Sequence, residues 1–439
     1  MKDRLFQVWF SLRCGVANKE FAELLDQYGS PYNIFMADED EIASMPCSDR
    51  LKRAFMDKNL DESYRILNYC ENNGVGLLFW TEKNYPSSLR VLRDPPSLLY
   101  FKGKLPDFAH FLCISIVGTR KMSEYGKKMA YKIGYELAAA RTVVVSGMAL
   151  GNDSVAAAGA LAAHGTTVAI LGSGIDIVYP PVHKRLMEEI IDRGGVVMSE
   201  YPPSTPPEQK NFPIRNRIIS GLSQGTVVVE ADMRSGALIT AKTAILQGRD
   251  VYAVPGNVGD VNTSGTNKLI HDGAIMVLGA RDILENYTFL YRDTIDTVRL
   301  LKAERTSDPN DDFLEMLGVY SRVSEEEKRT RTAEKARTTP SPSVPKPPRV
   351  QQVRLEERGK EVPRAKESAR REGDKSEQIL LTLTETQRKI FTALPLDRAV
   401  PVDYLTREGF SLSDVIASMT ILEIKGLVVS LPGGLYSRK

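Results

Sequence analysis

The chain has few of the residues that build metal sites and disulfide frameworks. Its 439 residues include only four cysteines (Cys14, Cys47, Cys70 and Cys113) and four histidines. The cysteines form no CxxC pair and no two histidines lie within five residues of each other, so the paired spacing of a zinc site is absent. Widely separated cysteines also favour a reducing cytosol. We therefore expect a cytoplasmic protein with no metal and no cofactor.

Long apolar runs and a strong net charge are missing as well. No run of about 18 apolar residues occurs, so we expect no membrane span. The apolar stretch at 8–12 is too short for a secretory signal. The 58 basic and 56 acidic residues give a net charge of only +2. Any surface that binds nucleic acid must then be a local basic patch.

Composition and periodicity divide the chain into four segments. Residues 1–75 show helical stripes of apolar residues and predict a small helical domain of the SAM or helix-hairpin-helix kind, which could bind DNA, dock a partner or cap the next domain. Residues 76–300 form the main α/β domain. Residues 301–378 are rich in proline and charge, which predicts a flexible linker.

Residues 379–439 have the pattern of a winged helix. Three predicted helices are followed by a hairpin with strands at 427–431 and 435–437. The third helix, at 411–425, carries acidic Asp414 and Glu423 and a single lysine. Because such a helix suits the major groove poorly, a structural or protein-docking role is at least as plausible as duplex reading.

The main domain alternates strand and helix patterns. Its near-continuous apolar strands predict a parallel sheet with helices on both faces, as in an extended Rossmann-like, doubly wound α/β fold. The predicted strands are 113–117, 142–145, 167–171, 196–199, 226–229, 251–254 and 274–277.

Four turns rich in glycine and serine follow these strands or precede a helix. Ligands of doubly wound sheets bind at the carboxyl ends of the strands. Glycines there let backbone N–H groups approach an anion, and helix N-termini add positive potential. With basic residues nearby, the turns favour phosphate binding. They are Gly118-Thr119-Arg120, Ser146-Gly147, Gly172-Ser173-Gly174 and Ser235-Gly236.

The segment 212–221, with sequence FPIRNRIISG, adds two arginines. If the chain is extended after Pro213, Arg215 and Arg217 point to the same side, although two such arginines alone more often form surface salt bridges. We expect a helix at 217–222. If it begins at Arg215 instead, the two side chains diverge by about 200° and Arg217 should face the ligand. Phe212 and Tyr179 could stack bases of a single strand, or merely pack under a loop.

Motifs of nucleotide enzymes are absent. The chain has no GxxxxGK[ST] and no GxSxG, and no complete GxGxxG. Asp153, Asp176, Glu200 and Glu230 could serve an N-glycosidic hydrolase, but Asp153 and Asp176 are more simply helix or turn caps. A non-catalytic surface for the backbone of a nucleic acid therefore suits the sequence better than an enzyme does.

Together these motifs resemble the DprA/Smf family of DNA-processing proteins over about residues 75–290. They include Val117-Gly-Thr-Arg120, Val145-Ser-Gly-Met-Ala149, Gly172-Ser-Gly-Ile-Asp176, the segment 212–221 and Val254-Pro-Gly256. The resemblance implies a homodimer that binds and protects single-stranded DNA and loads RecA onto it during natural transformation, without catalysis. This chain departs from the family at Ala156-Ala157, where an Ala-His pair is usual, and at His183, where Asn is common.

The resemblance also assigns phosphate contacts to Arg120, to Lys184 or Arg185, and to both arginines of the Arg-Asn-Arg motif. The alternative function is a nucleotide N-glycosidic hydrolase of the lysine-decarboxylase-like Rossmann group. Its Pro-Gly-Gly-x-Gly-Thr signature is replaced here by Pro-Gly-Asn-Val-Gly at 255–259, which speaks against it. The candidate DNA-binding residues are Gly118, Thr119, Arg120, Ser146, Gly147, Gly172, Ser173, Gly174, Lys184, Arg185, Phe212, Arg215, Asn216, Arg217, Ser235 and Gly236.

Overall fold

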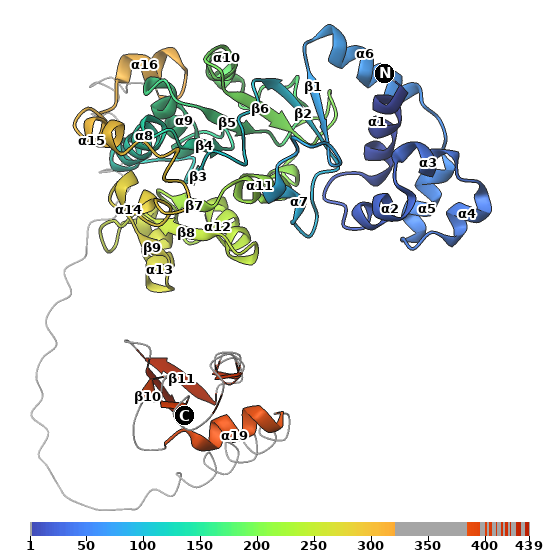
Figure 1. The fold of residues 1–439 in the computed structure, drawn as a ribbon. Helices are drawn as coiled ribbons and strands as arrows, with labels where there is room; N and C mark the ends of the chain where they lie inside the picture. Colours follow the sequence, from blue (N-terminus) through green and yellow to red (C-terminus); the bar gives the residue numbers. More distant parts are fainter. Residues whose placement is uncertain are drawn as a thin grey trace, which may run out of the picture. The chain divides into compact units, whose positions relative to one another are not determined.

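The computed structural model describes residues 2–320, 384–395 and parts of the segment 400–438. The chain divides into two compact units, Met1–Pro340 and Ser341–Lys439 (Figure 1). Within the described residues, no helix is long and apolar enough to cross a membrane.

A nine-stranded sheet is the centre of the first unit. Its strand order is β1-β2-β6-β5-β4-β3-β7-β8-β9. The seven strands from β6 to β9 pair in parallel, whereas β1 and β2 are antiparallel. The parallel strands confirm the prediction to within about two residues, but β1 and β2 were not predicted. The strands are β1 Gly76–Phe79, β2 Leu98–Gly103, β3 Cys113–Val117, β4 Val143–Ser146, β5 Thr167–Ile170, β6 Val196–Ser199, β7 Gly225–Val228, β8 Asp250–Ala253 and β9 Ile275–Met276.

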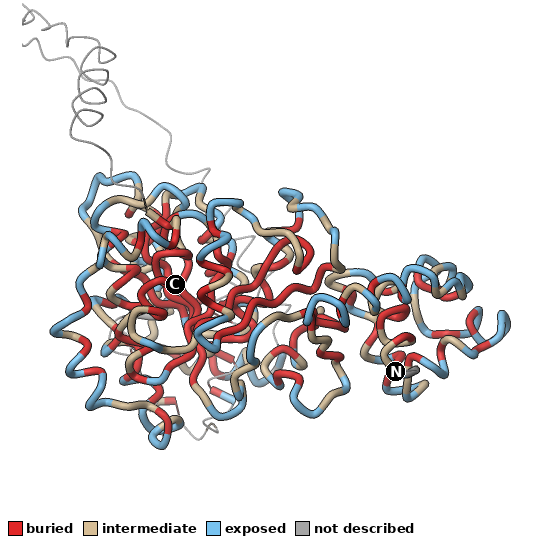
Figure 2. The backbone as a smooth tube through the Cα atoms, turned by 90° about the horizontal axis from the view of Figure 1, so that it is seen from above, coloured by how far each residue is buried: buried red, intermediate tan, exposed pale blue. Residues whose placement is uncertain are grey.

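Helices cover both faces of the sheet, as a doubly wound fold requires. Successive side chains of β3 alternate between two cores: Ile114 and Ile116 join one, whereas Cys113 and Val117 join the other. The central strands are accordingly buried throughout (Figure 2). Helices α8 Glu124–Ala139, α9 Asn152–Ala162 and α10 Lys184–Asp192 pack in the first core, and α7 Ser87–Arg90, α11 Asn211–Leu222 and α12 Gly236–Leu246 pack in the second.

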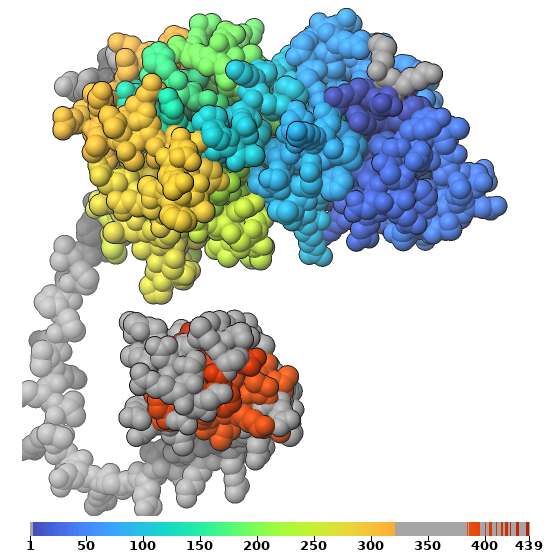
Figure 3. Space-filling view, in the orientation of Figure 1, coloured from blue at the N-terminus to red at the C-terminus, as the bar shows by residue number. Residues whose placement is uncertain are grey.

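Six short helices precede the sheet and confirm the helical prediction for residues 1–75. Helix α2 ends at Gly29, whose φ of 75° is left-handed, and α4 begins with a capping box formed by Asp38 and Glu41. The region packs beside β1, α7 and β2 (Figure 3), with Phe10 against Phe79. The helices are α1 Lys2–Cys14, α2 Phe21–Tyr28, α3 Pro31–Met36, α4 Glu39–Ser44, α5 Asp49–Met56 and α6 Asp61–Asn72.

The folded part of the first unit extends beyond the expected end of the domain at residue 300. Helix α16 (Asp311–Met316) and the residue after it place Leu314 and Leu317 in the core, and Asp311 pairs with Lys127 at 3.1 Å. The expected linker therefore does not begin at 301, because a few well-spaced apolar residues suffice to anchor 304–320. Residues 321–383 lie outside the described part. The other helices after β8 are α13 Ser264–His271, α14 Ala280–Leu284 and α15 Thr297–Ala303.

The second unit contains a helix and a small antiparallel sheet. Helix α19 (Glu385–Ala393) begins at a capping box formed by Thr384 and Gln387. The sheet has the order β10-β12-β11, and the hairpin of β11 (Val428–Leu431) and β12 (Leu435–Arg438) confirms the predicted strands; β10 is Val400–Pro401. The helices expected at 402–408 and 411–425 lie largely outside the described residues, so the winged helix stays a prediction.

Candidate nucleic-acid interface

The four glycine- and serine-rich turns lie at one edge of the sheet. The turns at 118–120, 146–147 and 172–174 follow β3, β4 and β5, which are adjacent parallel strands. Ser235 caps α12, which begins at Gly236 and follows β7, and β7 is the other neighbour of β3. Because the strands are parallel, their carboxyl ends share one edge, and the order of the connections reverses at β3, where such folds bind ligands.

Asp153 already occupies the space between the first two turns. Its carboxylate accepts hydrogen bonds from the N–H groups of Gly118 and Gly147 at 3.3 and 3.1 Å. Burial raises the pKa of this carboxyl group, and the nearby Arg215 opposes that shift. Two of the expected anion-binding N–H groups are therefore satisfied from within the protein. Asp153 holds two turns together and does not cap α9, whose N-cap is Gly151.

Arg215 connects the turns that follow β4 and β5. Helix α11 begins at Asn211, so the segment after Pro213 is helical and not extended. The Arg215 guanidinium is buried and donates hydrogen bonds to the carbonyls of Gly147, at 2.9 Å, and Ile170. Burial lowers its pKa to about 10, so the group stays protonated at neutral pH. Arg215 thus brings a positive charge to the edge and also fixes its shape.

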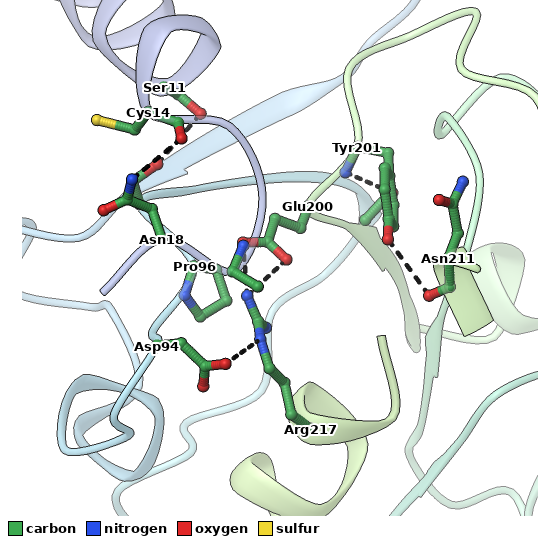
Figure 4. Close-up of polar contacts among 12 residues, drawn as sticks. Ser11, Cys14, Asn18, Asp94, Pro96, Glu200, Tyr201, Asn211 and Arg217 are labelled. Atoms are coloured by element: carbon green, nitrogen blue, oxygen red, sulfur yellow. Dashed lines mark hydrogen bonds and ion pairs between the residues drawn. The ribbon is translucent and has the colours of Figure 1, made fainter. Parts of the chain in front are cut away.

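Arg217 points elsewhere, which corrects the expectation that it faces the ligand. Its Nη2 lies 2.7 and 2.8 Å from the two carboxylate oxygens of Glu200, and its Nε lies 3.5 Å from Asp94 (Figure 4). Glu200 also accepts a hydrogen bond from the N–H of Ala17, in the N-terminal helical region, at 3.1 Å. Residues two apart on a helix diverge by about 200°, so Arg215 and Arg217 serve opposite sides of α11. The salt-bridge interpretation is right for Arg217, although the pair is buried.

Phe212 is the centre of a group of aromatic and basic side chains at the same edge. The Arg120 guanidinium lies 5.4 Å from the centroid of the Phe212 ring, and the Arg215 guanidinium lies 5.9 Å from it. The Tyr179 ring is 5.5 Å from the Phe212 ring and is 38% exposed. We call Arg120, Tyr179, Phe212 and Arg215 the Phe212 cluster. The predicted closeness of the two aromatic residues to the arginines is confirmed, and Tyr179 belongs with the candidate residues although it was not among them.

Of the two basic residues at the start of α10, only one is unpaired. Arg185 forms ion pairs with Glu189 at 2.6 Å and Glu188 at 3.7 Å. Lys184 is exposed and, within the described residues, forms no ion pair. His183, just before it, is buried, and its Nδ1 lies 2.9 Å from the carbonyl oxygen of Met148. This contact holds the start of α10 against the turn that follows β4, and burial lowers the pKa of His183.

The other candidate side chains serve the turns themselves. The hydroxyls of Ser146 and Ser173 donate to the carbonyls of Ile116 and Ile177, and Ser235 caps α12. The Thr119 hydroxyl accepts from the N–H of Lys121, and the Asn216 amide oxygen accepts from Arg215. Several backbone N–H groups of the turns are engaged as well: those of Thr119, Gly174 and Ser235 donate to the carbonyls of Glu230, Thr205 and Asp232.

The carboxylates that a hydrolase would need are all engaged. Asp176 accepts a hydrogen bond from the N–H of Ser204 at 2.8 Å, a contact between loops 28 residues apart in the chain. Glu230 accepts from the N–H and the hydroxyl of Ser123 at 2.9 and 2.5 Å. Asp153 and Glu200 are held as described above. Across the described part of the chain, no group of three or more His, Cys, Asp or Glu side chains could hold a metal ion.

The fold and this edge define a class of protein: an extended Rossmann-like α/β protein whose carboxyl edge carries basic and aromatic side chains. Residues 76–288 match the family model described as DNA recombination-mediator protein A. The chain is 34% identical to the DNA processing protein DprA of Streptococcus pneumoniae over 293 residues. The aligned region covers 66% of this chain and 100% of that protein. The chain belongs to the DprA/Smf family.

A further relative and the Streptococcus pneumoniae crystal structure agree with this assignment. Protein Smf of Escherichia coli is 38% identical over 241 residues, which span 52% of this chain but only 64% of that protein. The X-ray structure of the Streptococcus pneumoniae protein superposes with a TM-score of 0.55 over 64% of this chain and 97% of its own, at 33% identity. A Helicobacter pylori structure, described as showing that protein's single-stranded DNA binding mode, covers 50% of this chain and 97% of its own, at 28% identity and a TM-score of 0.45.

Proposed function

We propose that this protein binds single-stranded DNA along the carboxyl edge of its sheet and does so without catalysis. The observation that carries the proposal is the Phe212 cluster, in which two neighbouring aromatic rings lie beside two guanidinium groups. Unpaired bases stack on aromatic rings, and basic side chains neutralise the phosphates between them. Duplex DNA keeps its bases stacked inside the helix, so it would gain less from Tyr179 and Phe212.

The phosphate contacts are divided among residues with different roles. Arg120 and Lys184 are exposed and supply mobile positive charge, whereas Arg215 is buried and supplies fixed charge. The backbone of the turns at 172–174 and 235–236 completes the proposed track. Arg217 does not contact the DNA in this proposal. Its ion pair with Glu200 fixes α11, and thereby Arg215, against the N-terminal helices.

We extend the proposal to the partners that the family resemblance implies. The protein acts in the cytoplasm as a homodimer that protects incoming DNA and loads RecA onto it. The rate of RecA ATP hydrolysis on single strands coated with single-strand-binding protein measures this loading. A protein that binds DNA but leaves that rate unchanged would contradict the RecA part of the proposal.

The DNA part is tested by fluorescence anisotropy with an oligothymidine and a duplex of equal length at two salt concentrations. We expect tighter binding to the single strand, and affinity that falls as salt rises. Arg120→Ala should weaken binding by roughly 10- to 100-fold, since a hydrogen bond to a charged group contributes about 1.5–3 kcal/mol.

Arg292→Ala is the matched control. Arg292 is exposed. It lies five residues after Tyr287, whose hydroxyl donates to Asp250 at the amino end of β8. Arg292 is therefore away from the carboxyl edge of the sheet. Its loss should leave DNA binding unchanged. Equal or stronger binding to duplex, or affinity independent of salt, would overturn the proposal.

A further inference from the structure

A cavity of about 540 Å³ lies at the amino edge of the sheet, opposite the Phe212 cluster. Phe111, Thr142 and Thr166, which come just before β3, β4 and β5, form part of its wall. Ligand sites of small molecules typically measure about 300–1,000 Å³. Because the amino and carboxyl ends of parallel strands are at opposite edges, this cavity is separate from the proposed DNA track.

The cavity carries an excess of positive charge. Lys104, Arg141 and Arg299 line it, against one acidic lining residue, Asp107. A single carboxylate, Asp296, lies between the arginines, 3.5 Å from Arg299 Nε and 4.0 Å from Arg141 Nε. Lys104 forms no ion pair with any residue that the structure describes. The pair of guanidiniums therefore retains about one uncompensated charge, which suits an anionic ligand.

An unsatisfied hydroxyl lies in the wall of the same cavity. Thr142 is 1% exposed, and within the described residues its Oγ1 has no hydrogen-bond partner. Its backbone N–H is satisfied by the carbonyl of Leu137 at 3.0 Å, so only the side chain is left over. A buried polar group without a partner costs about 1–3 kcal/mol. The hydroxyl oxygen is covered, so a ligand oxygen would remove that cost once the cavity wall moves to expose it.

Strained backbone surrounds the cavity. Arg141 follows α8 with a φ of 63°, and His164 follows α9 with a φ of 53°. After α10 the corresponding residue is Gly194, with a φ of 84°. The left-handed conformation costs a residue other than glycine about 1–2 kcal/mol; here it belongs to the C-terminal caps of α8 and α9, where the N–H groups of Thr142 and Gly165 donate to the carbonyls of Leu137 and Ala160. Arg141 and His164, which both line the cavity, thus occupy positions where glycine would relieve the strain.

We propose that this cavity binds a phosphorylated nucleoside, with the phosphate on the sides of the Arg141 and Arg299 guanidiniums that Asp296 does not cover and the base against the apolar wall. Phe111 and Leu105 supply that wall, and Thr142 supplies a hydrogen bond. A free nucleoside monophosphate and the 5′-phosphorylated end of a strand share this chemistry. The site does not depend on the proposed DNA track, because no residue is common to both.

Isothermal titration calorimetry with deoxyadenosine monophosphate tests the proposal on the full chain. We expect binding to the wild type and at least tenfold weaker binding to Arg141→Ala/Arg299→Ala. Thr142→Val, nearly the same in shape, should weaken binding several-fold. Arg120→Ala should leave it unchanged, and equal melting temperatures of the variants show that the fold is kept.

A dinucleotide with a 5′-phosphate, compared with the monophosphate, distinguishes a strand end from a free nucleotide as the natural ligand. A dinucleotide with a 5′-phosphate that binds more tightly than the monophosphate indicates a strand end, and weaker binding indicates a free nucleotide. Three results would overturn the proposal: no binding of either phosphorylated ligand by the wild type, equal binding of deoxyadenosine without phosphate, or full binding by the Arg141/Arg299 double variant. The double variant should keep the wild-type affinity for oligothymidine, so failure here is separable from failure of the DNA proposal.

Discussion

Replacing Arg217 tests whether this arginine holds the fold together or contacts DNA. The Arg217 and Glu200 side chains are 6% and 4% exposed, and two N···O distances of 2.7 and 2.8 Å join them. Arg217→Met keeps an apolar stem but removes the charge, so Glu200 stays buried without its cation. Breaking a buried ion pair in this way costs about 3–5 kcal/mol. We therefore expect a large loss of stability.

The corresponding fall in melting temperature is roughly 6–20 °C, at about 2–4 °C for each kcal/mol. Arg217→Met/Glu200→Met removes both charges, and apolar replacement of a whole buried pair is often neutral or stabilising. The N–H of Ala17 still loses its acceptor in the double variant, a cost of about 1–3 kcal/mol. We thus expect the double variant to melt above the single variant and close to the wild type.

Calorimetric melting gives the stability, and anisotropy with oligothymidine, measured well below each melting temperature, gives the DNA affinity. Arg217→Met should bind within about twofold of the wild type, a change of about 0.4 kcal/mol. Arg120→Ala is the reference for a lost DNA contact. A tenfold loss of affinity in Arg217→Met at an unchanged melting temperature would refute the reasoning, since it would place the guanidinium on the DNA.

Two further predictions concern the start of α10. Lys184→Ala should weaken DNA binding and reduce the salt slope by about 1, whereas Arg185→Ala should change neither, because Arg185 is paired with Glu189; anisotropy titrations that show equal losses would contradict this division. His183 has a pKa lowered by burial, so below its unfolded value of about 6.5 the unfolded chain takes up a proton that the folded protein does not. Wild-type stability should therefore fall as the pH drops below about 6.5, and its melting-temperature difference from His183→Asn should shrink between pH 7.5 and 5.5; a constant difference would argue against it.

The sequence was sufficient for features that local chemistry specifies. Parallel strands buried on both faces are continuous apolar runs, so the strands from β3 to β8 were predictable to within about two residues. The turns after β3, β4 and β5 were equally visible, because parallel strands put their carboxyl ends at one edge. The antiparallel β1 and β2 were not predicted, although they are as long as the parallel strands, because they lie outside the strand–helix alternation on which the prediction rested.

Only the tertiary structure decided what each charged group contacts. Asp153 satisfies the N–H of Gly118, 35 residues away in the chain, and Arg217 pairs with Glu200, 17 residues away. Such contacts depend on how α9 and α11 pack on the sheet, and no local pattern encodes them. The sequence alone determined a doubly wound sheet with basic and aromatic residues along one edge. Packing decided that Arg215 lies at that edge while Arg217 is buried in an ion pair. Side chains two residues apart on a helix point to nearly opposite sides, so the two arginines could not both face the edge.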